Sequence, residues 1–291
     1  LCGPSCPAKV CQKCLLIHLR ASIDACYAGV LPRIRCPICL TRLNKSQWIK
    51  SVPRLVEVDN DDALLAVKCA RFCVQACSFQ TPCCHNVKYL HLPDFVSNDS
   101  TIDNLDEPAE LSKDSSSDSL TNAFLSLCRE FCFHKADGHA VVQFAIDHFN
   151  LKEPAVEPEA SSVPVPPPAK SVHELIEETL TRIGDDERRA SLLLSYLYMR
   201  PNATTRCCNL NFCFNCKRSG HHDKCDVRET ILDTCIVQCR SCRVMIVKIE
   251  GCDSVTCMCG YKMGWARERK IRSWNERGFI AVDVFDCDLH A

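Results

Sequence analysis

The clearest helical pattern of apolar residues follows Ser171. Ser171 and Glu174 have the spacing of a capping box, in which each side chain bonds the backbone N–H of the other residue. The apolar face that follows stops at Gly184 and consists of Leu175, Ile176, Leu180 and Ile183. A second, leucine-rich helix is expected over residues 186–199. The sequence therefore predicts two consecutive helices here.

Shorter patterns predict further elements on both sides of this pair. Residues 122–149 carry large apolar side chains at helical spacing, and residues 15–29 form a further expected helix that ends near Gly29. Residues 244–250 (VMIVKIE) are typical of a strand, and residues 266–277 of a basic helix. The run FIAVDVF at 279–285 predicts another short strand.

Two polar stretches interrupt the apolar pattern. Residues 97–121 contain seven acidic residues against one lysine and almost no large apolar residues, which predicts a disordered linker. Residues 150–170 contain six prolines and are expected to be extended and semi-stiff. The chain should therefore be divided into several units.

Composition adds the most informative fact, which is 26 cysteines among 291 residues. Such a number suits either disulfides outside the cell or metal binding in a reducing compartment. Four pairs have the Cys-x2-Cys spacing that directs two sulfurs at one metal, and this favours zinc and a cytoplasmic or nuclear protein. These pairs are Cys11/Cys14, Cys36/Cys39, Cys213/Cys216 and Cys239/Cys242.

Charge and hydropathy exclude other classes of function. The net charge of −1 provides no general attraction for nucleic acid, so a nucleic-acid partner is not expected. There is no apolar run of about 18 residues, and we recognise no signal peptide, so we expect no membrane span. The first residue is Leu1, which favours interpretation of the sequence as a fragment.

The first cysteine cluster contains Cys2, Cys6, Cys11 and Cys14, then a helical stretch, then Cys36-Pro37-Ile38-Cys39. This order resembles a RING finger, a family in which the first and third ligand pairs share one zinc and the second and fourth pairs share another. The resemblance implies that Cys2 and Cys6 are the second pair, Cys11 and Cys14 the third, and Cys36 and Cys39 the fourth. The first pair would lie before residue 1. It also implies that Pro37 and Ile38 contact a ubiquitin-conjugating enzyme; the alternative is a structural zinc knuckle with no partner.

The cysteines in the middle of the chain leave two interpretations open. Cys69, Cys73 and Cys77 would share one helix face, and Cys83, Cys84 and His85 follow a proline. Together these residues could bind a further zinc, or the thiols could be small apolar residues of a core. For Cys26, Cys128 and Cys132 we expect a core position.

A third cluster comprises Cys208, Cys213, Cys216, His221 and Cys225. The last four complete a site with three sulfurs and one imidazole, with His222 as a competing imidazole, and Cys208 should belong to a second metal. The sequence FCFNCKRSGHH resembles the in-between-RING domain, whose first cysteine pair is missing here. We hypothesise that the leucine-rich helix at 186–199 replaces that pair by apolar packing.

The last cluster holds five cysteines, one more than a tetrahedral zinc needs. The two close pairs, Cys239/Cys242 and Cys257/Cys259, are the simplest ligand set, with the strand at 244–250 between them. Cys252 is then left over in a loop that begins with Gly251. An accessible thiolate in such a loop suits acyl transfer through a thioester.

The order of these motifs resembles that of RING-between-RING ubiquitin ligases. The resemblance implies that ubiquitin passes from a conjugating enzyme to Cys252 and then to a lysine of a protein substrate, while Cys239, Cys242, Cys257 and Cys259 bind zinc. Ser254 stands where the family often has a histidine base, so Asp253 or a water is expected to accept the proton of the lysine. The alternatives are a non-catalytic zinc-finger scaffold that binds ubiquitin or a conjugating enzyme, and, less favoured, a nucleic-acid-binding zinc protein.

We therefore expect small α+β zinc-stapled modules joined by helices and disordered linkers. The expected segments are a partial RING finger at 1–50, a cysteine-rich helical segment with a candidate extra zinc site at 51–96, an acidic disordered linker at 97–121, a helical segment at 122–149, a proline-rich linker at 150–170, helices plus an in-between-RING domain at 171–230, and a catalytic second RING-like domain at 231–291.

Overall fold

The structure is a computed structural model of the 291-residue chain. It combines eight helices with three two-stranded sheets in the part it describes. The described residues are 6, 9–26, 29–51, 61–78, 92–96, 101–103, 116–149, 171–205, 208–215, 219–220, 236–241, 245–248 and 250–276.

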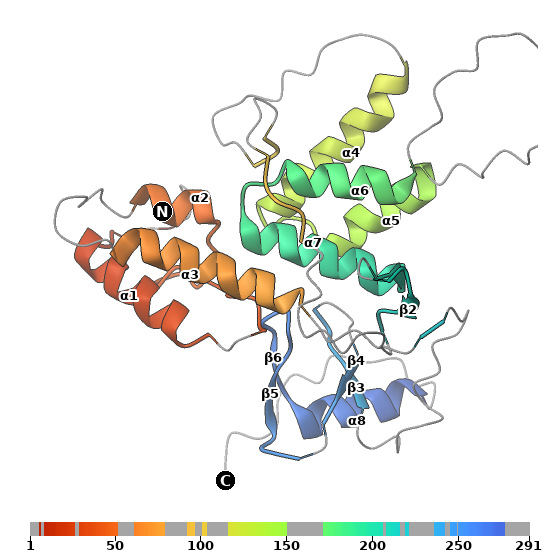
Figure 1. Cartoon of the computed structure of the whole chain (residues 1–291). Helices are drawn as coiled ribbons and strands as arrows, with labels where there is room; N and C mark the ends of the chain where they lie inside the picture. The colour runs from red at the N-terminus through yellow and green to blue at the C-terminus, as the bar shows by residue number, and fades with distance from the viewer. Residues whose placement is uncertain are drawn as a thin grey trace, which may run out of the picture.

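Five helices form the largest apolar core, which we call the helical core. They are α3 (Asp61–Ala76), α4 (Ser116–Cys132), α5 (Gly138–Phe149), α6 (Val172–Thr181) and α7 (Asp186–Met199). Helix α5 packs against α4, α6 and α7, and α7 also contacts α3 (Figure 1). The largest completely buried side chains of this core are Leu31, Phe124, Phe131, Ile176, Leu180, Ile183, Leu192 and Leu194.

Helices α6 and α7 begin where the sequence predicts. The hydroxyl of Ser171 accepts a hydrogen bond from the Glu174 backbone N–H at 3.2 Å, and the Glu174 carboxylate accepts from the Ser171 N–H at 2.8 Å. The predicted capping box is thus confirmed. At the start of α7, Asp185 accepts from the backbone N–H groups of Glu187 and Arg188. These caps satisfy N–H groups that a helix leaves without partners in its first turn.

The prediction that residues 97–121 form a disordered linker is wrong for part of that stretch. Ile102 and Asp103 are buried in the structure, and helix α4 begins at Ser116. The Asp103 carboxylate accepts hydrogen bonds from the backbone N–H groups of Gly184 and Asp185, at 2.9 and 2.8 Å. One apolar residue and one carboxylate therefore anchor residues 101–103, although the average composition around them is that of a linker.

The predicted division at 51–96 and 171–230 also differs from the structure. Helix α3 contacts both α1 (Gln12–Asp24) and α7, so it joins the first cysteine-rich segment to the helical core. Helices α6 and α7 share one core with α4 and α5, and Phe214, just after β2, also packs in this core. The hydrophobic effect is non-directional and does not depend on how far apart two helices are in the sequence. Leucine-rich helix faces therefore pack where the most apolar surface is buried.

The N-terminal module consists of α1 and α2 (Lys45–Ser51) with the loop between them. Helix α1 begins at Gln12, with Cys11 as its N-cap residue, and ends at Asp24, five residues before the predicted Gly29. Its buried side chains are Leu15, Leu19 and Ile23. They pack with Ile34, Leu43 and Trp48 and with Leu65, Cys69 and Phe72 of α3.

Three antiparallel hairpins follow the helical core. Strands β1 (Asn202–Thr204) and β2 (Asn211–Cys213) pair first, then β3 (Ile236–Gln238) with β4 (Met245–Val247), and β5 (Ser254–Thr256) with β6 (Lys262–Gly264). The predicted strand at 244–250 is thus shortened to three residues, and the predicted strand at 279–285 lies outside the described residues.

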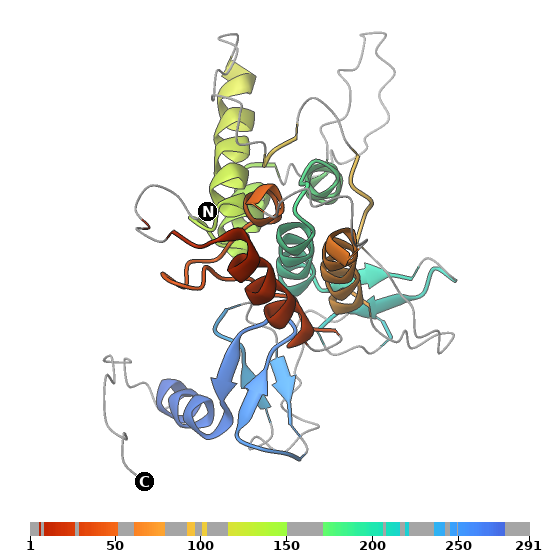
Figure 2. The ribbon, with the colours of Figure 1, turned by 90° about the vertical axis from the view of Figure 1, so that its left-hand side faces the viewer.

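The C-terminal module comprises β3 to β6 and α8 (Trp265–Glu276), which agrees with the basic helix predicted at 266–277. Figures 1 and 2 show this module beside the N-terminal module and at the opposite end of the molecule from α4 and α6. Within the described residues, no helix has both the length and the apolar character needed to cross a lipid bilayer.

Candidate metal centres and a candidate nucleophile

The N-terminal cluster comprises Cys6, Cys36 and Cys39, whose sulfur atoms all lie within 4.8 Å of one another. Cys36 is buried, Cys6 is half-buried and Cys39 is exposed. The RING resemblance assigns these residues to the second and fourth ligand pairs, which share one zinc in that family. Cys2, the fourth member of that set, lies outside the described residues.

The C-terminal cluster comprises Cys239, Cys257 and Cys259, also within 4.8 Å of one another. All three side chains are buried. Cys239 follows β3 directly, while Cys257 and Cys259 lie in the turn between β5 and β6, where Gly260 adopts φ +80°. Cys242, the fourth predicted ligand, lies outside the described residues.

The sulfur spacing in both clusters suits a tetrahedral metal ion. A zinc with Zn–S bonds of about 2.3 Å separates its sulfur ligands by roughly 3.8 Å. The distance between the sulfur atoms of Cys6 and Cys36 is 4.0 Å, and that between the sulfur atoms of Cys239 and Cys259 is 3.6 Å. No disulfide joins any of the described cysteines. Each cluster could therefore hold a metal ion, and its thiol donors suit zinc.

Cys11 and Cys14, the predicted third pair, lie apart from both clusters. Cys11 caps helix α1, and its sulfur accepts the backbone N–H of Cys14 at 3.3 Å. The side-chain hydrogen bond from Cys14, together with that backbone bond, lowers the pKa of the Cys11 thiol, and the same contact raises the pKa of Cys14. Both side chains are exposed.

Cys252 is exposed and does not belong to the C-terminal cluster. It follows Gly251, whose φ of +110° is a conformation that side chains with a Cβ rarely adopt. The thiol donates a hydrogen bond to the carbonyl of Ser254, 3.3 Å away. The structure thus divides the described cysteines of the last segment into three clustered thiols and one accessible thiol.

Asp253, the residue after the candidate nucleophile, is already engaged in capping α8. Its carboxylate accepts the backbone N–H of Ala266 at 2.7 Å, and its carbonyl accepts the N–H of Trp265, also at 2.7 Å. From the sequence, this carboxylate or a water was the expected base for the lysine. One of its oxygens instead stabilises the start of the last helix, where a negative charge also interacts favourably with the helix dipole.

The cysteines of the middle segment lie in apolar cores. Cys69 packs in the N-terminal module, and Cys73 and Cys77 pack in the helical core. Burial raises the pKa of Cys77 to about 12, so its sulfur remains a protonated thiol. Cys83, Cys84 and His85 lie outside the described residues. For the three described cysteines, the core interpretation is the one that the structure supports.

Cys128 and Cys132 are completely buried in the helical core, as predicted. Burial raises the pKa of Cys128 to about 12 and that of Cys132 well above its ordinary value. Cys26 is only half-buried, at the edge of the N-terminal core, and its thiol donates to the Ser22 carbonyl.

The third cysteine cluster is described only in part. Cys213 is buried at the end of β2, and Cys208 is exposed near the hydroxyl of Thr205, at 3.5 Å. Cys216, His221 and Cys225 lie outside the described residues, so this predicted zinc site stays a prediction.

Two exposed apolar side chains flank Cys39. Ile38 is 59% exposed and Leu40 is 61% exposed. Leu40 also has a positive φ of 59°, which is uncommon for a branched side chain. Pro37, the other residue predicted to contact a conjugating enzyme, is half-buried. The knuckle between Cys36 and Cys39 therefore presents apolar surface beside the N-terminal cluster.

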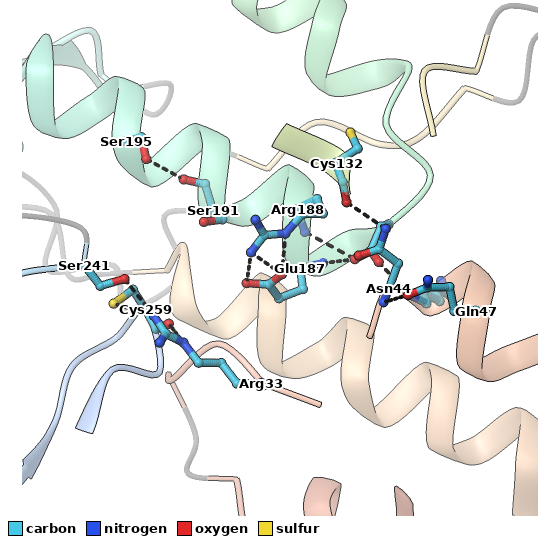
Figure 3. Close-up of polar contacts among 12 residues, drawn as sticks. Arg33, Asn44, Gln47, Cys132, Glu187, Arg188, Ser191, Ser195, Ser241 and Cys259 are labelled. Carbon is cyan, nitrogen blue, oxygen red and sulfur yellow. Dashed lines mark hydrogen bonds and ion pairs between the residues drawn. The ribbon is translucent and has the colours of Figure 1, made fainter. Parts of the chain in front are cut away.

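Arg33 is a candidate functional residue that no motif in the sequence indicates. Its guanidinium donates to the carbonyl of Cys259 at 2.6 Å and to the sulfur of Cys259 at 3.3 Å (Figure 3). The two residues are 226 positions apart in the sequence, and no local pattern around Arg33 indicates this contact.

Comparison with protein-family models, curated proteins and solved structures gives no match to this chain.

Proposed function

We propose that the chain is a ubiquitin-protein ligase that carries ubiquitin as a thioester on Cys252. The observation that supports this most directly is the separation of Cys252 from the C-terminal cluster. Three buried thiols are grouped at metal-binding distances, whereas the fourth described thiol of the same segment is exposed in a glycine-led loop. A residue that served only to bind the metal would be expected in the cluster.

The proposed reaction has two acyl transfers. The Cys252 thiolate attacks the carbonyl of the thioester between ubiquitin and the conjugating enzyme, and the enzyme's cysteine leaves as a thiolate. A substrate lysine amine then attacks the new thioester, forms an amide bond and releases the Cys252 thiolate. Because the Asp253 carboxylate caps α8 through one oxygen, we assign the amine's proton to water.

The N-terminal module supplies the recruiting surface in this proposal. Ile38 and Leu40 present apolar side chains beside Cys36 and Cys39, where an apolar surface of a conjugating enzyme could be buried. A metal ion bound at each cluster would be structural: it would hold the knuckles in shape and take no part in the acyl transfers.

The test uses a conjugating enzyme charged with ubiquitin and the full chain. We expect a ubiquitin adduct that thiol reductants release, and we expect Cys252→Ala to abolish it. Cys26→Ala is the matched control, because Cys26 is a half-buried cysteine outside both clusters and its replacement should leave the adduct unchanged. An Ile38→Ala variant should form the adduct more slowly. An adduct that persists in Cys252→Ala would contradict the proposal.

A second candidate function is a non-catalytic scaffold that binds ubiquitin or a conjugating enzyme. The capping role of Asp253 favours it, since that carboxylate is held by the start of α8 and Ser254 cannot act as a base at neutral pH. Binding of the conjugating enzyme without any adduct on Cys252 would select this candidate over the ligase.

A further inference from the structure

The N-terminal module touches the C-terminal cluster through a short loop, residues 31–33. The backbone N–H of Leu31 donates to the carbonyl of Met258 at 2.6 Å. Arg33 then makes three polar contacts, shown in Figure 3: its Nε donates to the Cys259 carbonyl, and its terminal nitrogen donates to the Ser241 hydroxyl at 2.9 Å and to the Cys259 sulfur. Its guanidinium also lies 6.0 Å from the centre of the Tyr261 ring.

Arg33 contacts both knuckles that carry the cluster. Ser241 lies in the turn after Cys239, and Cys259 lies in the turn between β5 and β6. A side chain that bonds both turns holds them at a fixed separation, which is what sulfur ligands to one ion require. Groups that hydrogen-bond to a metal ligand orient it and tune its strength in this way.

The charge of Arg33 matches the charge that a loaded cluster would carry. Metal ligation requires the thiolate form of cysteine, and three thiolates outweigh the two positive charges of a zinc ion. The three sulfurs are buried, where negative charge is costly unless a cation or a hydrogen-bond donor is close. Arg33 provides both, with the short N–H···S contact of a charge-assisted hydrogen bond.

Gly260 shows how closely the two segments approach. A Cβ atom at this position would lie 2.6 Å from the Leu31 carbonyl oxygen and 2.8 Å from Nε of Arg33. Only glycine leaves room for the loop at this distance, and the φ of +80° also favours glycine. The backbone of Leu31 and the side chain of Arg33 therefore both fit directly against the turn at Gly260.

We propose that Arg33 is a positioning residue for the C-terminal metal centre, so that metal binding at Cys239, Cys257 and Cys259 and docking of the 31–33 loop strengthen each other. The coupling is reciprocal, because a contact that raises the affinity for metal is itself strengthened by the metal to the same degree. The inference shares with the proposed function the metal at this cluster, but it requires no ubiquitin transfer.

The experiment measures zinc affinity of the full chain by competition with a chelator. Loss of a partner of a metal ligand typically weakens binding by about 10- to 100-fold, and we expect that loss for one ion in Arg33→Ala. Arg33→Lys should recover part of it, since an ammonium keeps the charge but cannot donate as a planar fork. Arg35→Ala is the matched control, because the Arg35 side chain is exposed and lies only two residues away in the sequence. This variant should bind zinc as tightly as the parent protein.

Two further measurements assign the effect to this cluster. Substitution with cobalt should give a thiolate-to-cobalt absorption band that shifts in Arg33→Ala and not in Arg35→Ala. In a Cys257→Ala background, Arg33→Ala should have no additional effect on zinc affinity, because both changes act on the same ion. Hydrogen exchange of the Leu31 amide should become faster when the metal is removed.

Several outcomes would overturn the inference. They are a parent chain that binds no metal, a zinc affinity and a cobalt spectrum unchanged in Arg33→Ala, and an Arg33→Ala effect of equal size in the Cys257→Ala background. Loss of ubiquitin transfer in Cys252→Ala together with a normal Arg33 effect would support this inference and the proposed function separately.

Discussion

Cys77 of the helical core and Cys257 of the C-terminal module are almost equally buried, with 1% and 2% of their surfaces exposed. Their surroundings differ in kind. Cys77 lies among apolar side chains, where burial raises its pKa to about 12 and keeps it protonated. Cys257 lies within 4.8 Å of two other sulfurs, in turns between very short strands. Burial alone therefore does not distinguish a structural thiol from a candidate ligand; the distance to other sulfurs does.

The two regions should also depend on different forces. The helical core buries large side chains such as Phe124 and Phe131, so its stability comes from apolar burial. The C-terminal module pairs three-residue strands around a few buried residues, which is a small core for independent stability. A metal ion bound at the cluster would add free energy of folding that this small core does not provide through apolar burial.

The largest effect is expected for Cys257→Ala. It should remove one zinc per chain and unfold the C-terminal module, because structural zinc contributes on the order of 10 kcal/mol in small zinc domains. Cys77→Ala, an equally buried position, should keep the full metal content. Metal analysis together with limited proteolysis of residues 236–276 measures both, and an equal zinc content in the two variants would remove the distinction between the regions.

Phe124→Ala tests the helical core, where we expect a loss of stability without a loss of zinc. Phe124 is completely buried against Phe144 and Phe149, so truncation should lower the free energy of unfolding by about 3–5 kcal/mol. The zinc content should not change. Denaturant unfolding followed by circular dichroism gives the stability; a loss of zinc in this variant would show that core and clusters fold as one unit.

The pH dependence of the two regions should have opposite signs. Burial raises the pKa of Asp185 to about 6 from an ordinary 3.8, so its contribution is present below pH 3.8 and is lost as the pH rises toward 6. The loss amounts to about 3 kcal/mol. Metal binding instead strengthens as the pH rises, because the thiols must lose protons.

Asp185→Asn isolates the first of these effects. The unfolding free energy of the parent minus that of the variant should fall by about 2 kcal/mol between pH 4 and pH 7, since the shared effect of metal cancels in the difference. Parallel stability curves for the two proteins over this range would show that Asp185 does not titrate in the folded state.

The smallest effect is expected for Ser171→Ala, which removes one side of the capping box at α6. The cost should be about 1 kcal/mol, visible as a lower denaturant midpoint. Ser126→Ala serves as the control, because Ser126 is an exposed residue inside α4. A cost in the control equal to that of Ser171→Ala would argue against the cap.

Local signals in the sequence predicted local structure well. The pair Ser171 and Glu174 fixed the start of α6, and the spacing of Cys252 relative to its neighbours separated it from the candidate ligands. Neither prediction required knowledge of a distant residue, because capping and ligand spacing act over a few positions.

The features that the sequence did not predict all depend on distant partners. Asp103 belongs to an acidic stretch by composition, yet its carboxylate caps a turn 81 and 82 positions away. Cys73 and Cys77 have a spacing that fits a metal site or a core equally, and only the position of α7 decides. Arg33 has no local motif at all. The local pattern around such a residue does not indicate which distant surface it will meet.

The contact between Leu31 and Met258 has a consequence for the way the chain is made. A ribosome adds about 5–20 residues per second, so about 10–50 s separate the synthesis of Arg33 from that of Cys259, 226 residues later. During that interval the arginine and the loop beside it face solvent, or whatever chaperone is near the nascent chain. The two modules can join only after residue 259 has been synthesised, so a product truncated before that residue would lose the surface on which the N-terminal module rests.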